Sequence, residues 1–365
     1  MVAISYAGYY SAEHFQFNGV VRVFQLDSQE NNWIQRGQDV LGVEATRLFG
    51  SSLSLNGKGT IMAIGSIGSG AYYGYPGSTA VYKLVNSTWV PLGPAIIGSS
   101  NASQCGFSAA LDYSGSHLAI GCPNSGNRQV GMAHVYSFDK NSSRWIPSGE
   151  PLIGESPFGS FGYAVHLSAD GRTLAVGAPN SDSDRNQTSF VFDGAGPLNT
   201  GGKGQVNVYS KVGGAWTLKG RILRGFFDGD ACGYNVKLSQ DGSSVVYGIP
   251  GREMLQGVIR RASFLDNDWV VQSASLLDPG VLVGEIFAIS ADATKVVSCT
   301  GSFSAQDPGF ARVYQDGNSS WTQLGQALNG GALCTVAISS AGNKIAVGTP
   351  SPTGNGQVTV FKYGR

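Results

Sequence analysis

The sequence has few charged side chains, no long apolar run and no cluster of basic residues. Charged residues make up 13% of the 365 residues, and 24 basic side chains balance 24 acidic ones. This balance excludes the basic surface by which proteins bind nucleic acid or an anionic membrane. No apolar stretch reaches the roughly 18 residues that span a bilayer, so we expect no transmembrane segment.

Recognisable leader and catalytic motifs are also absent. The first residues, MVAISYAGYYSAEHF, lack the basic and apolar regions of a signal peptide. Met1 falls inside a repeat, so we expect the sequence to be a mature or incomplete form. No P-loop, nucleophile elbow or Cys/His metal spacing occurs, which favours a protein that is not an enzyme. A carboxylate pair assembled from several repeats would leave no such motif.

Six tryptophans mark an internal repeat. They lie at positions 33, 89, 145, 216, 269 and 321, at intervals of 56, 56, 71, 53 and 52 residues, and each follows a polar turn and opens a strand-like run. Burial of such a ring stabilises a protein by about 2 to 3 kcal/mol. A large aromatic residue at one phase of a repeat is therefore a packing element.

Further strands recur with the same period. Seven alternating runs carry a third strand per repeat, from GVVRVFQL at 19–26 to GQVTVFKY at 356–363. Short turns separate two more strands in six repeats, mostly as dipeptides that tolerate positive φ, such as Asp170-Gly171. Four antiparallel strands in about 50 residues are typical of a propeller blade.

The pattern predicts an all-β fold, a seven-bladed β-propeller of four-stranded antiparallel blades in a single domain. Blade 1 lacks its first strand and blade 7 its last, and six blades is the alternative because one terminal unit could pack outside the ring. The expected blade units are 1–45, 46–102, 103–158, 159–229, 230–281, 282–330 and 331–365.

Two recurring motifs resemble FG-GAP repeats. Phe49-Gly50 and Phe161-Gly162 open first strands, Cys105-Gly106 and Cys232-Gly233 are degenerate copies, and GCP (121–123), GAP (177–179), GIP (248–250) and GTP (348–350) end second strands. The resemblance covers essentially the whole chain and implies the seven-bladed propeller of integrin α subunits. This family includes adhesion receptors, lectin-like modules and enzyme appendages, so the fold does not determine the function.

The calcium loop of that family is missing. Its calcium-binding members carry D-x-[DN]-x-D-G between the first two strands, whereas here we expect a two-residue turn, which cannot gather six oxygen ligands. A similar alternation occurs elsewhere, at Asn180, Asp182 and Asp184. These residues form a calcium site or an ordinary solvated acidic loop, and no other cofactor is expected.

Four of the five cysteines are disulfide candidates. Cys105 and Cys122 flank one hairpin at nearly cross-strand positions, and Cys299 and Cys334 lie in adjacent blades. Alternatively, all four are small buried residues that replace the apolar residues of the repeat. Cys232 remains unpaired in either case.

Glycosylation sequons indicate a secreted or cell-surface glycoprotein. They occur at Asn86, Asn101, Asn141, Asn186 and Asn318, and three of them occupy the same turn before a tryptophan. Polar turns that match the sequon by chance are the alternative.

Aromatic residues gather in the longer connections, where a rigid scaffold carries binding loops. The candidate partner-binding residues are Tyr9, Tyr10, Phe15, Phe17, Tyr72, Tyr73, Tyr75, Phe226 and Phe227. They form an exposed patch or fold back over the blades.

The sequence therefore predicts a non-enzymatic extracellular module for protein adhesion or surface assembly, with a protein partner or another copy of the chain. A lectin-like propeller that binds carbohydrate is the alternative. A hydrolase or lyase with its site at the channel mouth is the third hypothesis.

Overall fold

The computed structural model describes residues 1–7, 10–11, 16–17, 19–27, 32–42, 48–67, 75–100, 103–182, 202–252, 256–272, 274–278, 281–301, 309–317, 319–331, 334–349 and 356–362. Within these residues the chain is nearly all β, and it includes the short 3-10 turn η1 (Asn127–Gln129). Two compact units divide the chain. Unit 1 comprises residues 1–174 and 211–217, and unit 2 comprises residues 175–210 and 218–365.

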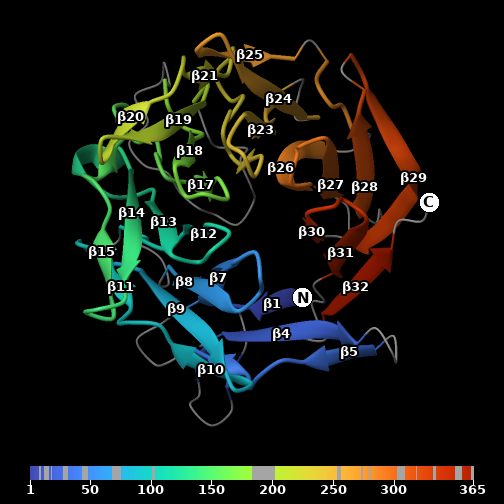
Figure 1. The fold of residues 1–365 in the computed structure, drawn as a ribbon. Coiled ribbons are helices and arrows are strands. Elements are labelled where there is room, and N and C mark those ends of the chain that lie inside the picture. Colours follow the sequence, from blue (N-terminus) through green and yellow to red (C-terminus); the bar gives the residue numbers. More distant parts are fainter. Residues whose placement is uncertain are drawn as a thin grey trace. The chain divides into compact units, whose positions relative to one another are not determined.

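Three antiparallel sheets lie wholly in unit 1 (Figure 1). The first contains β1 (Val2–Tyr6), β4 (Val20–Asp27), β5 (Asn32–Gln35) and β6 (Val40–Leu41), beside the hairpin β2 (Tyr10–Ser11) and β3 (Gln16–Phe17). The second contains β7 (Phe49–Leu55), β8 (Ile61–Ser66), β9 (Ser78–Val85), β10 (Thr88–Pro91) and β11 (Ile96–Ile97). The third contains β12 (Ser108–Leu111), β13 (His117–Cys122), β14 (Met132–Asp139), β15 (Arg144–Pro147) and β16 (Leu152–Ile153).

The division between the units passes through the fourth sheet, which contains β17 (Ala164–Leu167), β18 (Thr173–Ala178), β19 (Gln205–Val212), β20 (Ala215–Leu218) and β21 (Leu223–Arg224). Unit 2 holds three further sheets. The fifth contains β22 (Val236–Leu238), β23 (Ser244–Ile249), β24 (Val258–Leu265) and β25 (Asp268–Val271). The sixth contains β26 (Val281–Ile289), β27 (Lys295–Gly301), β28 (Gly309–Asp316) and β29 (Trp321–Gly331), and the seventh contains β30 (Thr335–Ile338), β31 (Lys344–Thr349) and β32 (Gln357–Lys362).

The fold class is a seven-bladed β-propeller, as the repeat predicts. Each complete blade runs in chain order through four antiparallel strands, here named A to D, and the tryptophan is the first or second residue of strand D. The first sheet lacks a strand A and the seventh lacks a strand D among the described residues. In blades 1 to 4 a short additional strand pairs with strand C after strand D has ended.

The turns between strands A and B are longer than the predicted two residues. Five residues, 56–60 in blade 2 and 239–243 in blade 5, separate these strands. The hydroxyl of Ser239 donates to Asp241 and accepts from the backbone N–H of Ser244 at 2.9 Å. Side-chain hydrogen bonds therefore satisfy the backbone of the longer turn.

The tryptophans connect successive blades through their indole N–H groups. Each of four indoles donates to the carbonyl of the residue three positions after the preceding blade's tryptophan. These bonds are Trp89 to Arg36 (2.7 Å), Trp145 to Leu92 (2.8 Å), Trp216 to Ser148 (2.8 Å) and Trp269 to Lys219 (2.6 Å). Buried indole nitrogens need such a partner. The Nε1 of Trp321 is buried without one among the described residues.

Close backbone contacts explain why the glycines of the two motifs recur. A Cβ atom on Gly248, near the end of strand B of blade 5, would lie 1.8 Å from the carbonyl oxygen of Gly284, which lies in strand A of blade 6. Gly121 and Gly162 repeat this contact at 1.8 Å between blades 3 and 4. Gly284 also has a φ of 95°, which side chains disfavour. Glycine therefore recurs at these motif positions because the neighbouring blade lies too close for a side chain.

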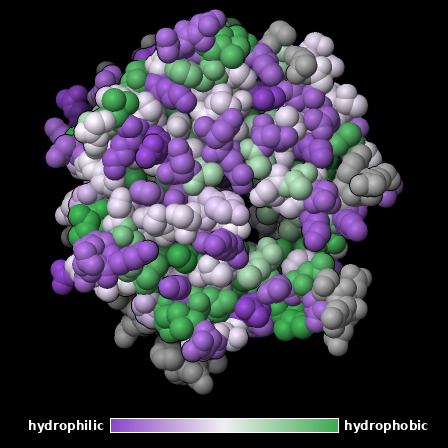
Figure 2. Space-filling model, in the orientation of Figure 1, coloured by the Kyte–Doolittle hydropathy of each residue, from purple (hydrophilic) through white to green (hydrophobic). Residues whose placement is uncertain are grey.

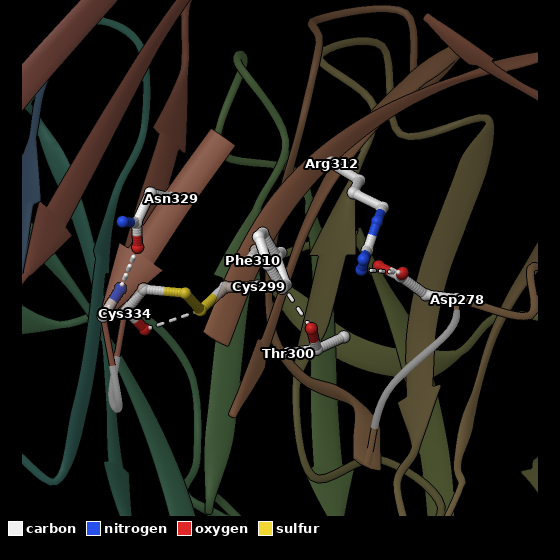
Figure 3. Close-up of a disulfide and its surroundings, with 8 residues drawn as sticks. Asp278, Cys299, Thr300, Phe310, Arg312, Asn329 and Cys334 are labelled. Atoms are coloured by element: carbon white, nitrogen blue, oxygen red, sulfur yellow. Dashed lines mark hydrogen bonds and ion pairs between the residues drawn. A yellow bond between two sulfur atoms is a disulfide. The ribbon is translucent and has the colours of Figure 1, made fainter. Parts of the chain in front are cut away.

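All four disulfide candidates are paired. Cys105 and Cys122 join the start of strand A to the end of strand B within blade 3. Cys299 on β27 and Cys334 before β30 join blades 6 and 7, with their Cα atoms 6.0 Å apart (Figure 3). Cys232 is a buried free cysteine.

The surface mixes polar and apolar side chains. In Figure 2 hydrophilic residues spread over the face in view, with hydrophobic residues in separate patches between them. No helix in the described part of the chain is long and apolar enough to cross a membrane.

Candidate active site

Most of the predicted aromatic patch lies outside the described residues, as Tyr9, Phe15, Tyr72 and Tyr73 do. Tyr10 and Phe17 face each other in the register of the hairpin of β2 and β3. Tyr75 is half-buried. The structure therefore leaves the proposed patch of blades 1 and 2 untested.

Phe226 and Phe227 are exposed, with relative accessibilities of 57% and 66%. The carboxylate of Asp230 accepts from their backbone N–H groups at 2.7 and 3.1 Å and from Arg252 at 3.3 Å. The guanidinium of Arg252 stacks over both rings, 4.8 and 5.3 Å from their centroids, and that of Arg260 lies 5.1 Å from the Phe226 ring. The loop is thus held by cation–π contacts and by one buried carboxylate.

The predicted calcium ligands are only partly described. Asp182 contacts the guanidinium of Arg224, Asn180 is buried, and Asp184 lies outside the described residues. In the part of the chain that the structure describes, no group of three or more Asp, Glu, His or Cys side chains could hold a metal ion.

Two of the five sequon asparagines, Asn86 and Asn141, are described, and both are exposed. Asn101, Asn186 and Asn318 lie outside the described residues. Whether a glycan is attached at any of the five stays a prediction.

The innermost strands position the strongest candidate residues. A glycine of positive φ lies just before strand A in blades 3, 4 and 5 (Gly106, Gly162 and Gly233) and within the first four residues of strand A in blades 2 and 6 (Gly50 and Gly284). Because these glycines are fixed against the neighbouring blade, the residue after each has a fixed place near the start of the innermost strand. In unit 2 these residues are Tyr234 and Glu285.

Glu285 is a half-buried carboxyl with a perturbed pKa. Burial raises the pKa of Glu285, and a hydrogen bond from the Tyr234 side chain opposes that rise. The side-chain amide of Asn235 donates to the backbone carbonyl of Glu285 at 3.2 Å, which ties the two innermost strands together. No Lys or Arg forms an ion pair with Glu285 among the described residues. A carboxyl with a raised pKa is a stronger proton acceptor than an ordinary glutamate once it is ionised, which suits a general base.

Asp278 is the second acidic residue with a raised pKa, and its setting differs. Burial raises the pKa of Asp278, but its carboxylate accepts from the guanidinium of Arg312 at 2.7 Å, as Figure 3 shows beside the disulfide. Asp278 is fully buried. Because its carboxylate is buried and paired with a guanidinium, Asp278 suits a structural role better than a catalytic one.

Lys237 lies three residues beyond Tyr234, on the innermost strand β22. Its side chain is half-buried between the buried Val236 and Leu238, and burial lowers the pKa of Lys237 to about 8. It forms no ion pair and donates no side-chain hydrogen bond among the described residues.

No model of a known protein family matches the chain, and no curated protein matches it in sequence. Solved structures match it in fold. A provisionally assigned 6-phosphogluconolactonase from Bacteroides uniformis has a TM-score of 0.56 and 10% identity, over 94% of this chain and 92% of its own. A second, from Bacteroides fragilis, has a TM-score of 0.57 and 10% identity, over 94% and 90%. Hydrazine synthase from Kuenenia stuttgartiensis has a TM-score of 0.56 and 10% identity, over 94% and 92%.

These comparisons correct the functional prediction. We expected a non-enzymatic module for adhesion, with a lectin as the alternative, and that prediction is wrong because structures that share the fold over most of their length bear the names of enzymes. The propeller is confirmed, whereas the FG-GAP resemblance has no matching family model. The recurring Gly and Trp residues reflect how the blades pack. Because one fold hosts many functions, these residues do not identify the function.

The sequence motifs did not identify Glu285, Tyr234 or Lys237. Tyr234 and Lys237 lie in the fifth blade and Glu285 in the sixth, and none belongs to a short chemical motif. One signal was present, because the position after the repeat glycine holds Ser51, Phe107, Tyr163 and Tyr234 in other blades and an acidic residue only at Glu285.

Proposed function

We propose that the chain is a hydrolase of small esters or lactones, with Glu285 as its general acid–base and Tyr234 as the residue that orients it. The main support for this proposal is the half-buried Glu285 carboxyl. It has a raised pKa, a tyrosine partner and no cationic partner among the described residues. Perturbed carboxyls of this kind are enriched at catalytic sites.

The chemistry follows from the state of this carboxyl. As the carboxylate, Glu285 takes a proton from a water molecule while the water oxygen attacks the substrate carbonyl carbon. When the C–O bond of the ester or lactone breaks, Glu285 returns the proton to the leaving oxygen. The products are a carboxylic acid and an alcohol, or the open-chain hydroxy acid of a lactone. The hydrogen bond from Tyr234 fixes the carboxyl in one orientation.

The names of two structures of similar fold direct the choice of substrate. Both are provisionally assigned 6-phosphogluconolactonases, although likeness at 10% identity supports only the fold. 6-Phosphogluconolactone and uncharged δ-gluconolactone are therefore the first substrates to test.

The test is acid release, followed in a pH-stat above the spontaneous rate. Glu285→Gln keeps the shape of the side chain but cannot transfer the proton, so we expect kcat to fall by about 10²- to 10⁴-fold. Glu150→Gln, at an exposed carboxyl in unit 1, is the matched control and should keep wild-type activity. Hydrolysis no faster than the spontaneous reaction, or full activity in Glu285→Gln, would overturn the proposal.

We also propose that the chain folds in an oxidising compartment outside the cytosol. The support is the two disulfides, Cys105–Cys122 and Cys299–Cys334, since such bonds persist mainly in secreted and periplasmic proteins. Mass spectrometry of protein isolated from its native source, after thiol blocking without reductant, tests this. Four unblocked cysteines support it, and blocking of all five contradicts it.

A further inference from the structure

Lys237 stands out among the amines of unit 2 because no side chain that the structure describes compensates its charge. The ammonium of Lys219, by contrast, donates to the carbonyl of Gly242 at 2.8 Å and lies 4.5 Å from the centre of the Phe264 ring. A buried cation without a partner is costly to a fold. Such a residue is retained where a ligand supplies the missing charge.

No described carboxylate of the fifth and sixth blades forms an ion pair with Lys237. Asp230 pairs with Arg252, Asp278 with Arg312, and Asp316 with Arg261. Asp241 and Asp292 are held in turns by serine hydroxyls and backbone N–H groups, and Asp268 pairs with Arg221. Glu285 is hydrogen-bonded to Tyr234.

The strand register places Lys237 beside the proposed reaction centre. Lys237 is opposite Val246, which is opposite Arg261, so the three share one face of the fifth sheet. Tyr247 and Arg260 lie opposite each other on the other face, which separates Lys237 from the loop of Phe226. Asn235 precedes Lys237 by two residues, and its amide contacts the carbonyl of Glu285. Two residues along a strand span about 7 Å.

We infer that Lys237 is a binding residue for the anionic group of the substrate, and that the substrate is a small ester or lactone with a phosphate or carboxylate a few bonds from its carbonyl. This inference rests on the proposed hydrolase function for the identity of the substrate, but the anion site itself can be tested without it. An anion at Lys237 would compensate the buried ammonium, while the substrate carbonyl would lie toward Glu285 on the adjacent strand.

The first experiment measures the reactivity of the amine in the full-length protein. Isotopically labelled acetic anhydride acetylates lysines in competition, and mass spectrometry gives the rate at Lys237 and at the exposed Lys58 as the control. We expect saturating inorganic phosphate to raise the pKa of Lys237 by about one unit. Because this pKa starts at about 8, the acetylation rate at pH 8 should then fall about fivefold, without a change at Lys58. A parallel arm with acetate distinguishes a phosphate site from a general carboxylate site. An unchanged Lys237 rate in both arms, or equal protection of Lys58, would overturn the inference.

The second experiment separates anion binding from a structural role. Lys237→Met keeps the length and apolar stem of the side chain but removes the charge, and Lys237→Arg keeps the charge. For 6-phosphogluconolactone, we expect Lys237→Met to raise KM at least tenfold with kcat nearly unchanged. For uncharged δ-gluconolactone, its KM should equal that of the wild type. Lys237→Arg should recover most of the loss in affinity for 6-phosphogluconolactone. An equal rise in KM for both lactones would contradict anion binding. Absence of hydrolysis in the wild type would reject the hydrolase alone, because protection of Lys237 by phosphate is measured without turnover.

Discussion

The indole Nε1 of Trp269 donates a 2.6 Å hydrogen bond to the carbonyl of Lys219, three residues after the tryptophan of the preceding blade. Trp269 is fully buried, and the same bond recurs at Trp89, Trp145 and Trp216. Packing and a directional hydrogen bond therefore act at the same position of each repeat. This explains why tryptophan, and no other aromatic residue, occupies it.

Trp269→Ala is expected to destabilise the protein by about 3 to 5 kcal/mol, because it leaves a cavity and the unpaired Lys219 carbonyl. Trp33 donates no such hydrogen bond among the described residues and is 37% exposed, so Trp33→Ala should cost no more than about 1 kcal/mol. Urea unfolding followed by circular dichroism measures both. Equal losses in the two variants would show that the indole is not an interblade element.

Gly248→Ala is expected to destabilise the protein by about 1 to 3 kcal/mol or more, because the new Cβ would overlap the carbonyl oxygen of Gly284. Gly213 is the opposite case, with a φ of 58° and no atom within 4 Å of its Cβ position. Gly213→Ala should therefore cost only about 1 kcal/mol from backbone strain. Thermal unfolding of both variants compares them, and the reverse order would refute the contact as the reason for the motif glycine.

The repeat predicted the number of blades, the third strand of every blade and the incomplete first and last sheets. These features depend on alternation and on residues such as Trp269 and Gly248, whose packing role is the same in each copy. The longer A–B turns were missed because side-chain hydrogen bonds such as that of Ser239 have no dipeptide signature. The candidate site was missed because Glu285 and Tyr234 approach only when two blades pack.

Removal of the disulfide Cys299–Cys334 is expected to destabilise the protein by about 4 kcal/mol in a chain-entropy estimate, since the cysteines are 35 residues apart. For Cys105–Cys122, which are 17 apart, the same estimate gives about 3 kcal/mol. Double Cys→Ala variants of each pair, unfolded in urea without reductant, measure these losses. No loss on removing the longer bridge would show that the seventh blade is held without it.

The raised pKa of Glu285 predicts a pH-dependent stability difference. A carboxyl whose pKa is higher in the folded state favours folding when it is protonated. Its ionisation therefore destabilises the fold increasingly as pH rises from the ordinary glutamate pKa of 4.5 through the raised pKa of the folded state. Glu285→Gln should therefore be more stable than the wild type at pH 7, and this advantage should vanish below pH 4. Thermal unfolding of both proteins across this range is the measurement. A wild type that is more stable at pH 7 would mean that the ionised carboxylate stabilises the fold.

The pH dependence of kcat/KM for lactone hydrolysis tests the central claim most directly, with wild type and Glu285→Gln compared over the same range. If Glu285 is the general base, kcat/KM of the wild type should rise with pH through an apparent pKa above the ordinary value for glutamate. Glu285→Gln should lack this rising limb of the pH profile, and its rate should be at least a hundredfold lower. An unchanged limb in Glu285→Gln would place the proton transfer on another residue and contradict the account.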